Sequence, residues 1–195
     1  WNMPKIQIVP PFFSDPLFIE AWSKVGLPYL KNEPDHVLFS YHGLPLRHLK
    51  KSDFSGNWCE NNMECCLELT NENKYCYSAH CHKTSKLIAE RLKLDEKKWS
   101  VSFQSRFGRE EWVKPYTEKH LEELAQNGAK RVLVFCPSFV ADCLETTEEI
   151  GMQAAENFQK YGGKELILVD SLNDHPEWIK SLTSIIQQQI SYTKT

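Results

Sequence analysis

Short apolar runs alternate with longer helix-like patterns along most of the chain, and this alternation constrains the fold more than any other feature of the sequence. Each apolar run is bounded by turn-forming residues, as expected of buried strands. The predicted strands are Lys5–Val9, Val37–Tyr41, Trp99–Gln104, Arg131–Cys136 and Glu165–Val169. The predicted helices are Pro16–Val25, Cys81–Leu94, Thr117–Asn127, Leu144–Tyr161 and Pro176–Tyr192. This order predicts an α/β fold with a doubly wound, mostly parallel sheet and flanking helices.

Composition narrows the class of protein. The chain has 195 residues, 41% of them hydrophobic and 25% charged, which is ordinary for a globular domain. A net charge of −3 without a Lys/Arg run gives no electrostatic basis for binding nucleic acid. The sequence has no apolar stretch of the roughly 18 residues that span a bilayer and no signal peptide, so we expect a cytoplasmic protein. A start at Trp1 instead of Met predicts part of a longer chain.

A cysteine-rich segment interrupts the alternating pattern. The span Arg47–Lys74 is too long for an ordinary connection, which predicts a functional or disordered insertion. Five of the seven cysteines lie within 23 positions: Cys59, Cys65, Cys66, Cys76 and Cys81. An odd number of cysteines without a secretion signal argues against a disulfide framework. Zinc sites usually have paired C-x2-C motifs, which are absent, so an iron–sulfur cluster is favoured, while zinc and free thiols stay open.

Polar residues follow three of the predicted strands, at the edge of a parallel sheet where ligands bind. His42 ends one strand and precedes a sharp Gly43 turn, so its imidazole could ligate a metal or accept a proton. A structural histidine that bonds its own turn is the alternative.

A second polar cluster, Gln104, Ser105 and Arg106, follows the next strand. Aromatic residues surround it, which suggests a cleft for a planar ligand. A packed surface loop is the alternative.

The third cluster is acidic and consists of Asp142, Glu145 and Glu149. Glu145 and Glu149 are four residues apart and share one face of the predicted helix. Neighbouring carboxylates can form a proton acceptor or a site for a hard cation. Acidic residues that only complement the helix dipole are the alternative.

Three motifs in order resemble the ferrochelatase family, particularly its Gram-negative bacterial members. They are Phe39–Pro45, Phe103–Gly108 with Glu111–Thr117, and Phe139–Thr146. The resemblance implies insertion of ferrous iron into a porphyrin, protoporphyrin IX, in the last step of haem biosynthesis. It further implies that His42 and Glu145 are catalytic and face each other across the macrocycle.

The same resemblance assigns further site residues. It implies that His42, Glu145, Glu149 and Asp142 contact the substrate iron. Gln104, Ser105, Arg106 and Trp112 would bind the porphyrin.

Members of the family are longer and have two similar α/β domains. The resemblance therefore implies that residues 1–30 are a remnant of the first domain, a strand and a helix. Residues 31–195 would form the C-terminal chelatase domain, with residues 47–81 as an insertion. The missing N-terminal domain would be a partner, and peripheral contact with a membrane is compatible with an apolar porphyrin.

Some bacterial ferrochelatases bind a [2Fe–2S] cluster, and the cysteine-rich segment resembles theirs. The resemblance implies Cys59, Cys65, Cys66 and Cys76 as ligands. Adjacent Cys65 and Cys66 are geometrically awkward together, so Cys81 is an alternative ligand. Two other functions stay open: a cobalt or sirohydrochlorin chelatase, and a non-catalytic iron–sulfur or metal-binding module.

Overall fold

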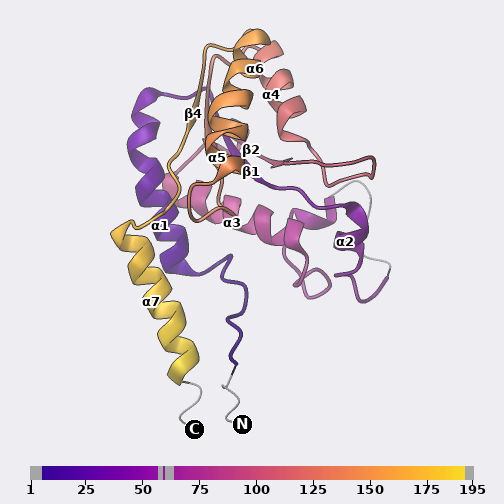
Figure 1. Cartoon of the computed structure of the whole chain (residues 1–195), viewed down its shortest axis with the longest axis vertical. Coiled ribbons are helices and arrows are strands. Elements are labelled where there is room, and N and C mark those ends of the chain that lie inside the picture. The colour runs from indigo at the N-terminus through magenta and orange to yellow at the C-terminus, as the bar shows by residue number, and fades with distance from the viewer. Residues whose placement is uncertain (1–5, 57–58, 60–63, 192–195) are drawn as a thin grey trace.

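Four parallel strands form a sheet at the centre of the molecule, with helices on both of its faces (Figure 1). The structure is a computed structural model that describes residues 6–56, 59 and 64–191. The strands are β1 (His36–His42), β2 (Trp99–Gln104), β3 (Arg131–Phe135) and β4 (Glu165–Leu168), in the spatial order β2-β1-β3-β4. The α/β fold with a parallel sheet predicted from the sequence is confirmed.

The described helices surround this sheet. The α-helices are α1 (Pro16–Gly26), α2 (Leu46–Lys50), α3 (Tyr77–Leu92), α4 (Thr117–Gln126), α5 (Leu144–Thr147), α6 (Ala155–Lys160) and α7 (Pro176–Ser191). Short 3-10 helices are η1 (Leu27–Asn32), η2 (Glu64–Cys66) and η3 (Glu96–Lys98), and η4 (Glu149–Ala154) is a π-helix.

Alternation of side chains along β1 divides the interior into two cores. Phe39 and Tyr41 pack with residues of α1 and α3, whereas Leu38 packs with residues of α4 and α6 on the opposite face. Successive side chains of a strand point to opposite faces, so a strand buried on both sides needs a continuous apolar run. This explains why β1 and β3 have almost no exposed residues.

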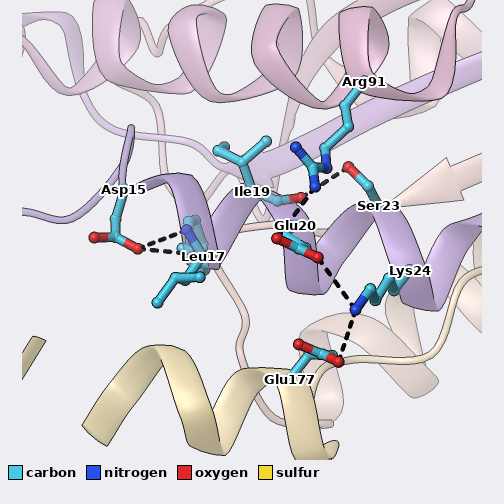
Figure 2. A network of polar contacts seen from close by, with 9 residues as sticks. Asp15, Leu17, Ile19, Glu20, Ser23, Lys24, Arg91 and Glu177 are labelled. Carbon is cyan, nitrogen blue, oxygen red and sulfur yellow. Dashed lines mark hydrogen bonds and ion pairs between the residues drawn. The ribbon is translucent and has the colours of Figure 1, made fainter. Parts of the chain in front are cut away.

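Helix α1 lies between α3 and α7 (Figure 2). The carboxylate of Asp15 caps its N-terminus by accepting hydrogen bonds from the amides of residues 17 and 18, at 3.0 and 3.1 Å. Lys24 pairs with Glu20 in α1 and Glu177 in α7, and Arg91 of α3 also pairs with Glu20. These pairs are largely exposed to solvent, so water and salt screen them and they add little to stability.

Apolar burial attaches α1 more firmly than these ion pairs do. Trp22 is fully buried and packs edge-to-face against Phe135 of the sheet, with ring centroids 6.4 Å apart. Helix α1 therefore shares the core of the sheet that follows it. Its assignment to a remnant of another domain, residues 1–30, stays a prediction.

The predicted strand Lys5–Val9 is wrong over its described part. Lys5 lies outside the described residues, and residues 6–9 form no strand. Ile6 and Ile8 are 82% and 84% exposed, and the amide of Gln7 donates to the carbonyl of Gln189 in α7. A strand requires a neighbouring strand to pair with, and the four strands of the sheet do not extend to this segment.

Two predicted helices differ from the structure. The predicted helix Leu144–Tyr161 is divided into α5, η4 and α6. The amide of Gln153 bonds the carbonyl of Glu148, five residues back, which widens the turn. The predicted helix Cys81–Leu94 begins earlier, at Tyr77. Tyr192, the predicted end of the last helix, lies outside the described residues.

Candidate active site

His42 ends β1 at the carboxyl edge of the sheet and is partly buried. Its Nδ1 lies 2.7 Å from the carbonyl oxygen of Gly43. Since a carbonyl oxygen can only accept, Nδ1 carries the proton and the neutral imidazole has its lone pair on Nε2. The interaction with its own turn therefore orients the imidazole and prepares Nε2 to accept a proton or bind a metal.

Two aromatic rings flank this imidazole. The rings of Trp112 and Phe139 lie 6.3 and 6.2 Å from the His42 ring. Trp112 is held there because the segment around it pairs with residues 44–46, through a bridge to Pro45. A Cβ on Gly43 would lie 3.1 Å from the Trp112 indole and 3.0 Å from the carbonyl oxygen of Gln104, so this close approach favours glycine.

Gln104 ends β2 directly beside His42, its register partner in β1. Its side chain is buried, and its oxygen accepts from the hydroxyl of Ser40 at 2.7 Å. Its Nε2 donates to the carbonyl of Glu145 at 2.6 Å and to the carboxylate of Glu149 at 3.2 Å. The amide is thus engaged inside the protein, so Gln104 links the sheet to α5 and η4.

Ser105 holds the Glu149 carboxylate at the start of the π-helix. Its backbone amide and its hydroxyl donate to the two carboxylate oxygens, at 2.7 and 2.6 Å. Ser105 has a positive φ of 62°, which turns the chain so that both donors face the same carboxylate. Gln104 and Ser105 together hold the Glu149 carboxylate in place. The sequence predicts Glu149 on the same helix face as Glu145.

Glu145 lies in α5 and is electrostatically coupled to His42. The pKa of its carboxyl is lowered by its own backbone amide and by the side chain of Cys143, and further by the charge of His42. The first and third predicted clusters of the sheet edge are therefore brought together, although His42 and Glu145 belong to segments about 100 residues apart in the sequence.

Asp142 is oriented differently from the two glutamates. Its carboxylate accepts from Asn173 Nδ2 at 2.8 Å and from the amide of Ser171 at 3.3 Å, and these bonds lower its pKa. The side chain therefore joins the α5 junction to the loop before α7. The bonds around Glu149 do not include it.

Arg106 and a cavity of about 490 Å³ lie beside the Glu149 network. The guanidinium of Arg106 is exposed and lies 5.0 Å from the centre of the Tyr116 ring. Gln104, Ser105 and Glu149 also line the cavity, but His42 and Trp112 do not. The predicted porphyrin-binding residues thus divide into Trp112 beside His42 and the other three beside Glu149.

The cysteine-rich segment brings four thiols together. Cys59, Cys65 and Cys76 line one small cavity of about 10 Å³, and the sulfur atoms of Cys65 and Cys66 are 3.7 Å apart. Burial, followed by the neighbouring Cys65 and Cys76, raises the pKa of Cys59 to about 11. A hydrogen bond between Cys66 and Cys76 raises the pKa of the Cys66 thiol and lowers that of Cys76.

None of these cysteines forms a disulfide. Among the residues that the structure describes, no three His, Cys, Asp or Glu side chains are arranged to hold a metal ion. Cys66 does not line the small cavity that Cys59, Cys65 and Cys76 share.

Cys81 does not line the small cavity that Cys59, Cys65 and Cys76 share. It is buried in α3 and lines a different cavity of about 230 Å³, together with Tyr77, Tyr41 and Ser138. Burial raises the pKa of its thiol well above the ordinary value. Cys81 shares the buried core on this face of the sheet with Cys66 and Cys76.

Three contributors to this region were missed in the sequence. The hydroxyl of Tyr77 donates to the carbonyl of His42 at 2.9 Å, and the His42 amide donates to Ser138 at 3.4 Å. Buried Asn73 organises the cysteine-rich segment by bonding the carbonyl of Cys65 at 2.6 Å. The role of Tyr77 has no sign in the sequence, because its hydrogen-bond partner His42 lies 35 residues away and no periodic pattern links the two.

A family model described as Ferrochelatase matches residues 1–190 of this chain. The chain belongs to the ferrochelatase family. It is 47% identical over 185 residues to the ferrochelatase of Pseudomonas fluorescens (strain Pf0-1), covering 94% of this chain and 54% of that protein. It is 48% identical over 182 residues to the ferrochelatase of Azotobacter vinelandii, covering 93% of this chain and 54% of that protein.

A third ferrochelatase, from Legionella pneumophila (strain Corby), is 46% identical over 188 residues, covering 96% of this chain and 55% of that protein. The chain thus spans about half the length of the curated relatives that it matches. Within the described part of this ferrochelatase-family chain, no helix is long and apolar enough to cross a membrane.

Proposed function

We propose that this chain carries the catalytic residues of a ferrochelatase, which inserts ferrous iron into protoporphyrin IX in haem biosynthesis. The observation that carries the proposal is the pair formed by His42 and Glu145. A hydrogen bond to Gly43 leaves Nε2 of His42 as the basic nitrogen, and once protonated His42 lowers the pKa of the nearby Glu145 carboxyl.

Metal insertion into a porphyrin requires both a base and a group that delivers the metal, because two pyrrole protons must leave as Fe²⁺ enters. We assign proton acceptance to Nε2 of His42. The carboxylate of Glu145 would approach the iron, as a hard oxygen ligand does. Glu149 would relay protons or iron behind Glu145, with Gln104 and Ser105 holding it in place.

We assign different roles to the remaining predicted site residues. Trp112 and Arg106 would contact the porphyrin, since one flanks His42 and the other is exposed at the edge of the cavity. Gln104 and Ser105 would position Glu149. Asp142 was expected to contact iron, but its bonds to Asn173 support a role in positioning α5.

The whole protein would contain a second α/β domain that forms the other wall of the cleft, with its boundary near residue 30. We place the complete enzyme in the cytoplasm, with peripheral contact to a membrane through which the apolar porphyrin arrives. Comparison of membrane and soluble fractions from cells that produce the full-length protein tests this placement.

Measurement of iron insertion by the full-length protein tests the catalytic proposal. His42→Ala and Glu145→Gln should each lower kcat by at least about 100-fold, the usual range for a lost proton-transfer group. Glu156→Gln is the matched control, because Glu156 is an exposed glutamate in the nearby α6. Wild-type activity in His42→Ala would exclude the proposal, as would a preference for cobalt and sirohydrochlorin over iron and protoporphyrin.

We further propose that Cys59, Cys65, Cys66 and Cys76 hold a [2Fe–2S] cluster. Three of these free cysteines line one small cavity, and the sulfur of the fourth, Cys66, lies 3.7 Å from that of Cys65. This arrangement supports the proposal, since such clusters bind four cysteine thiolates. Cys81, in a different cavity, would not be a ligand. A bound cluster would supply a redox-active or structural centre outside the porphyrin cleft.

Anaerobic purification of the full-length protein, with iron, sulfide and zinc counts and a visible absorption spectrum, tests the cluster. Cys76→Ser should remove the iron–sulfur absorption. Cys143→Ser should not, because Cys143 lies at the start of α5 and outside the four-thiol group. A colourless protein that contains zinc would contradict the cluster.

A further inference from the structure

A row of hydroxyl groups lies buried between the sheet and α4. Ser40 of β1 and Ser102 of β2 are register partners and are fully buried, and Thr117, the first residue of α4, is 4% exposed. The Thr117 hydroxyl lies 2.8 Å from the hydroxyls of both serines. Apolar side chains usually fill such positions, because burying a hydroxyl costs free energy unless it is bonded. These three hydroxyls therefore require an explanation beyond packing.

The main chain holds Thr117 in this place. Residues 115–116 run beside β2, since the amide of Phe103 donates to the carbonyl of Pro115 at 2.8 Å and Phe103 forms a bridge with Tyr116. Helix α4 then begins at Thr117. Main-chain bonds thus bring the Thr117 hydroxyl to the sheet, and a substitution of its side chain leaves these bonds in place.

The orientation of the Gln104 amide determines which hydroxyl donates in each bond. Its Nε2 donates to the Glu149 carboxylate at 3.2 Å, and its Oε1 accepts from the Ser40 hydroxyl at 2.7 Å. Because a hydroxyl has one proton, Ser40 must accept from Thr117, and Thr117 must accept from Ser102. The four side chains form what we call the hydroxyl chain, in which every member donates in the direction of Glu149: Ser102, Thr117, Ser40 and Gln104.

The opposite orientation of the amide is unfavourable. It would place Oε1 of Gln104 against the Glu145 carbonyl and the Glu149 carboxylate, which both accept. The Ser40 hydroxyl opposes this flip, because Oε1 would lose its donor. The thiol of Cys136 lies 3.7 Å from the same oxygen but is only a weak donor. Successive hydrogen bonds polarise one another, so a donor to Ser40 strengthens the bond that Ser40 makes.

We propose that Ser40 and Thr117 are positioning residues, whose hydroxyls hold the Gln104 amide in the orientation that donates to Glu149. Both act through Gln104 and neither contacts the reacting atoms. The inference rests on the proposed role of Glu149 as a relay for protons or iron. The orientation of the amide can nevertheless be measured without any catalysis.

Two substitutions of Thr117 separate its hydroxyl from its packing. Thr117→Val keeps the branched shape and removes the hydroxyl, whereas Thr117→Ser keeps the hydroxyl and removes the methyl group. Ser40→Ala removes the direct donor to Gln104, and Ser85→Ala is its matched control. Ser85 is also fully buried, and its hydroxyl lies 2.8 Å from that of Tyr41 in the core on the opposite face of the sheet.

Hydrogen exchange of the Gln104 side-chain amide, followed by NMR of isotopically labelled full-length protein, tests the orientation. The signal is identified by its absence from Gln104→Met, and the slowest main-chain amides of the sheet serve as the reference for global unfolding. In the wild type we expect far slower exchange than at the exposed amide of Gln126.

Relative to that reference, Ser40→Ala and Thr117→Val should each accelerate exchange of the Gln104 amide about fivefold or more, the factor for one lost hydrogen bond. Thr117→Ser and Ser85→Ala should keep the wild-type rate, since the hydroxyl chain remains complete in both.

Three outcomes would overturn the proposal. Exchange of the wild-type Gln104 amide as fast as that of Gln126 would do so without any variant. Equal rates in Thr117→Val and the wild type would show that the Thr117 hydroxyl does not hold the amide. Acceleration in Thr117→Ser or Ser85→Ala as large as in the test variants would assign the effect to packing.

Iron insertion provides the second readout. Ser40→Ala should lower kcat about fivefold with the KM for porphyrin unchanged, because Glu149 is misplaced while Trp112 and Arg106 remain. Ser85→Ala should match the wild type in both constants. A rise in KM alone would contradict a positioning role. Full activity of Glu149→Gln would instead refute the proposed role of Glu149 and leave the measured orientation of the amide standing.

Discussion

Replacement of Gln104 by Glu is the sharpest test of the network that holds the acidic residues. The side chain is 3% exposed, and its Nε2 donates to the Glu145 carbonyl and to the Glu149 carboxylate. Gln104→Glu preserves the shape of the side chain but replaces its amide donor by a carboxylate oxygen, which can only accept. The carbonyl of Glu145 and the carboxylate of Glu149 would then each face this oxygen without a hydrogen between them. Each buried group left without its partner costs about 1–3 kcal/mol. We therefore expect a loss of about 3 kcal/mol in the free energy of unfolding.

The loss should appear as an unfolding temperature lower by several °C, measured by circular dichroism of the full-length protein at pH 7. Gln126→Glu is the matched control, because the Gln126 amide also donates to a glutamate carboxylate but is exposed. The control should lose less than about 0.5 kcal/mol. Equal losses in the two variants would refute the reasoning that burial of the Gln104 amide matters.

The deficit of Gln104→Glu should also depend on pH. The introduced carboxyl would have a folded-state pKa above its unfolded value of about 4.3, because only its protonated form can donate to the two acceptors. The deficit is therefore small below about pH 4 and grows as the pH rises from the unfolded pKa through the raised folded pKa. A deficit independent of pH would show that the carboxylate finds another arrangement.

Three further predictions concern the packing and charge around the site. Gly43→Ala should lower kcat and cost about 1–3 kcal/mol of stability, because the added methyl would lie 3.0 Å from a carbonyl oxygen and 3.1 Å from an indole carbon. Gly151→Ala is the control: the nearest atom would be 3.4 Å away, so thermal unfolding should show no loss of stability. Burial lowers the pKa of His82 to about 4, so the unfolded chain binds its proton first and stability falls as the pH drops from about 6.5 to 4. His82→Phe should remove about 2 kcal/mol of that fall in urea titrations, and an unchanged pH profile would exclude His82 as its source. Asp142→Asn should cost about 1 kcal/mol of stability and leave kcat nearly intact, whereas a large loss of iron insertion would restore Asp142 to the iron-contacting residues.

The sequence determined the class of the sheet and the order of its elements along the chain. Apolar runs such as those of β1 and β3 are buried on both faces, and a helix between successive strands leaves parallel pairing as the stable arrangement. Because carboxyl ends of parallel strands meet at one edge, the approach of His42 to the acidic helix followed from the same pattern. The prediction of a strand at residues 5–9 was wrong over its described part, because an apolar run in the sequence cannot show whether a partner strand is present.

Only the tertiary structure decided what each polar side chain does. Gln104 looked like a substrate-binding residue, but its register beside His42 turns its amide into the interior, toward Glu145 and Glu149. In the sequence Cys81 is one of five similar cysteines, whereas in the structure it lines a different cavity from Cys59, Cys65 and Cys76. Likewise, the bond from Tyr77 to His42 joins residues 35 positions apart. Periodicity reports which face of an element is buried, whereas hydrogen-bond partners depend on the register and packing of elements distant in sequence.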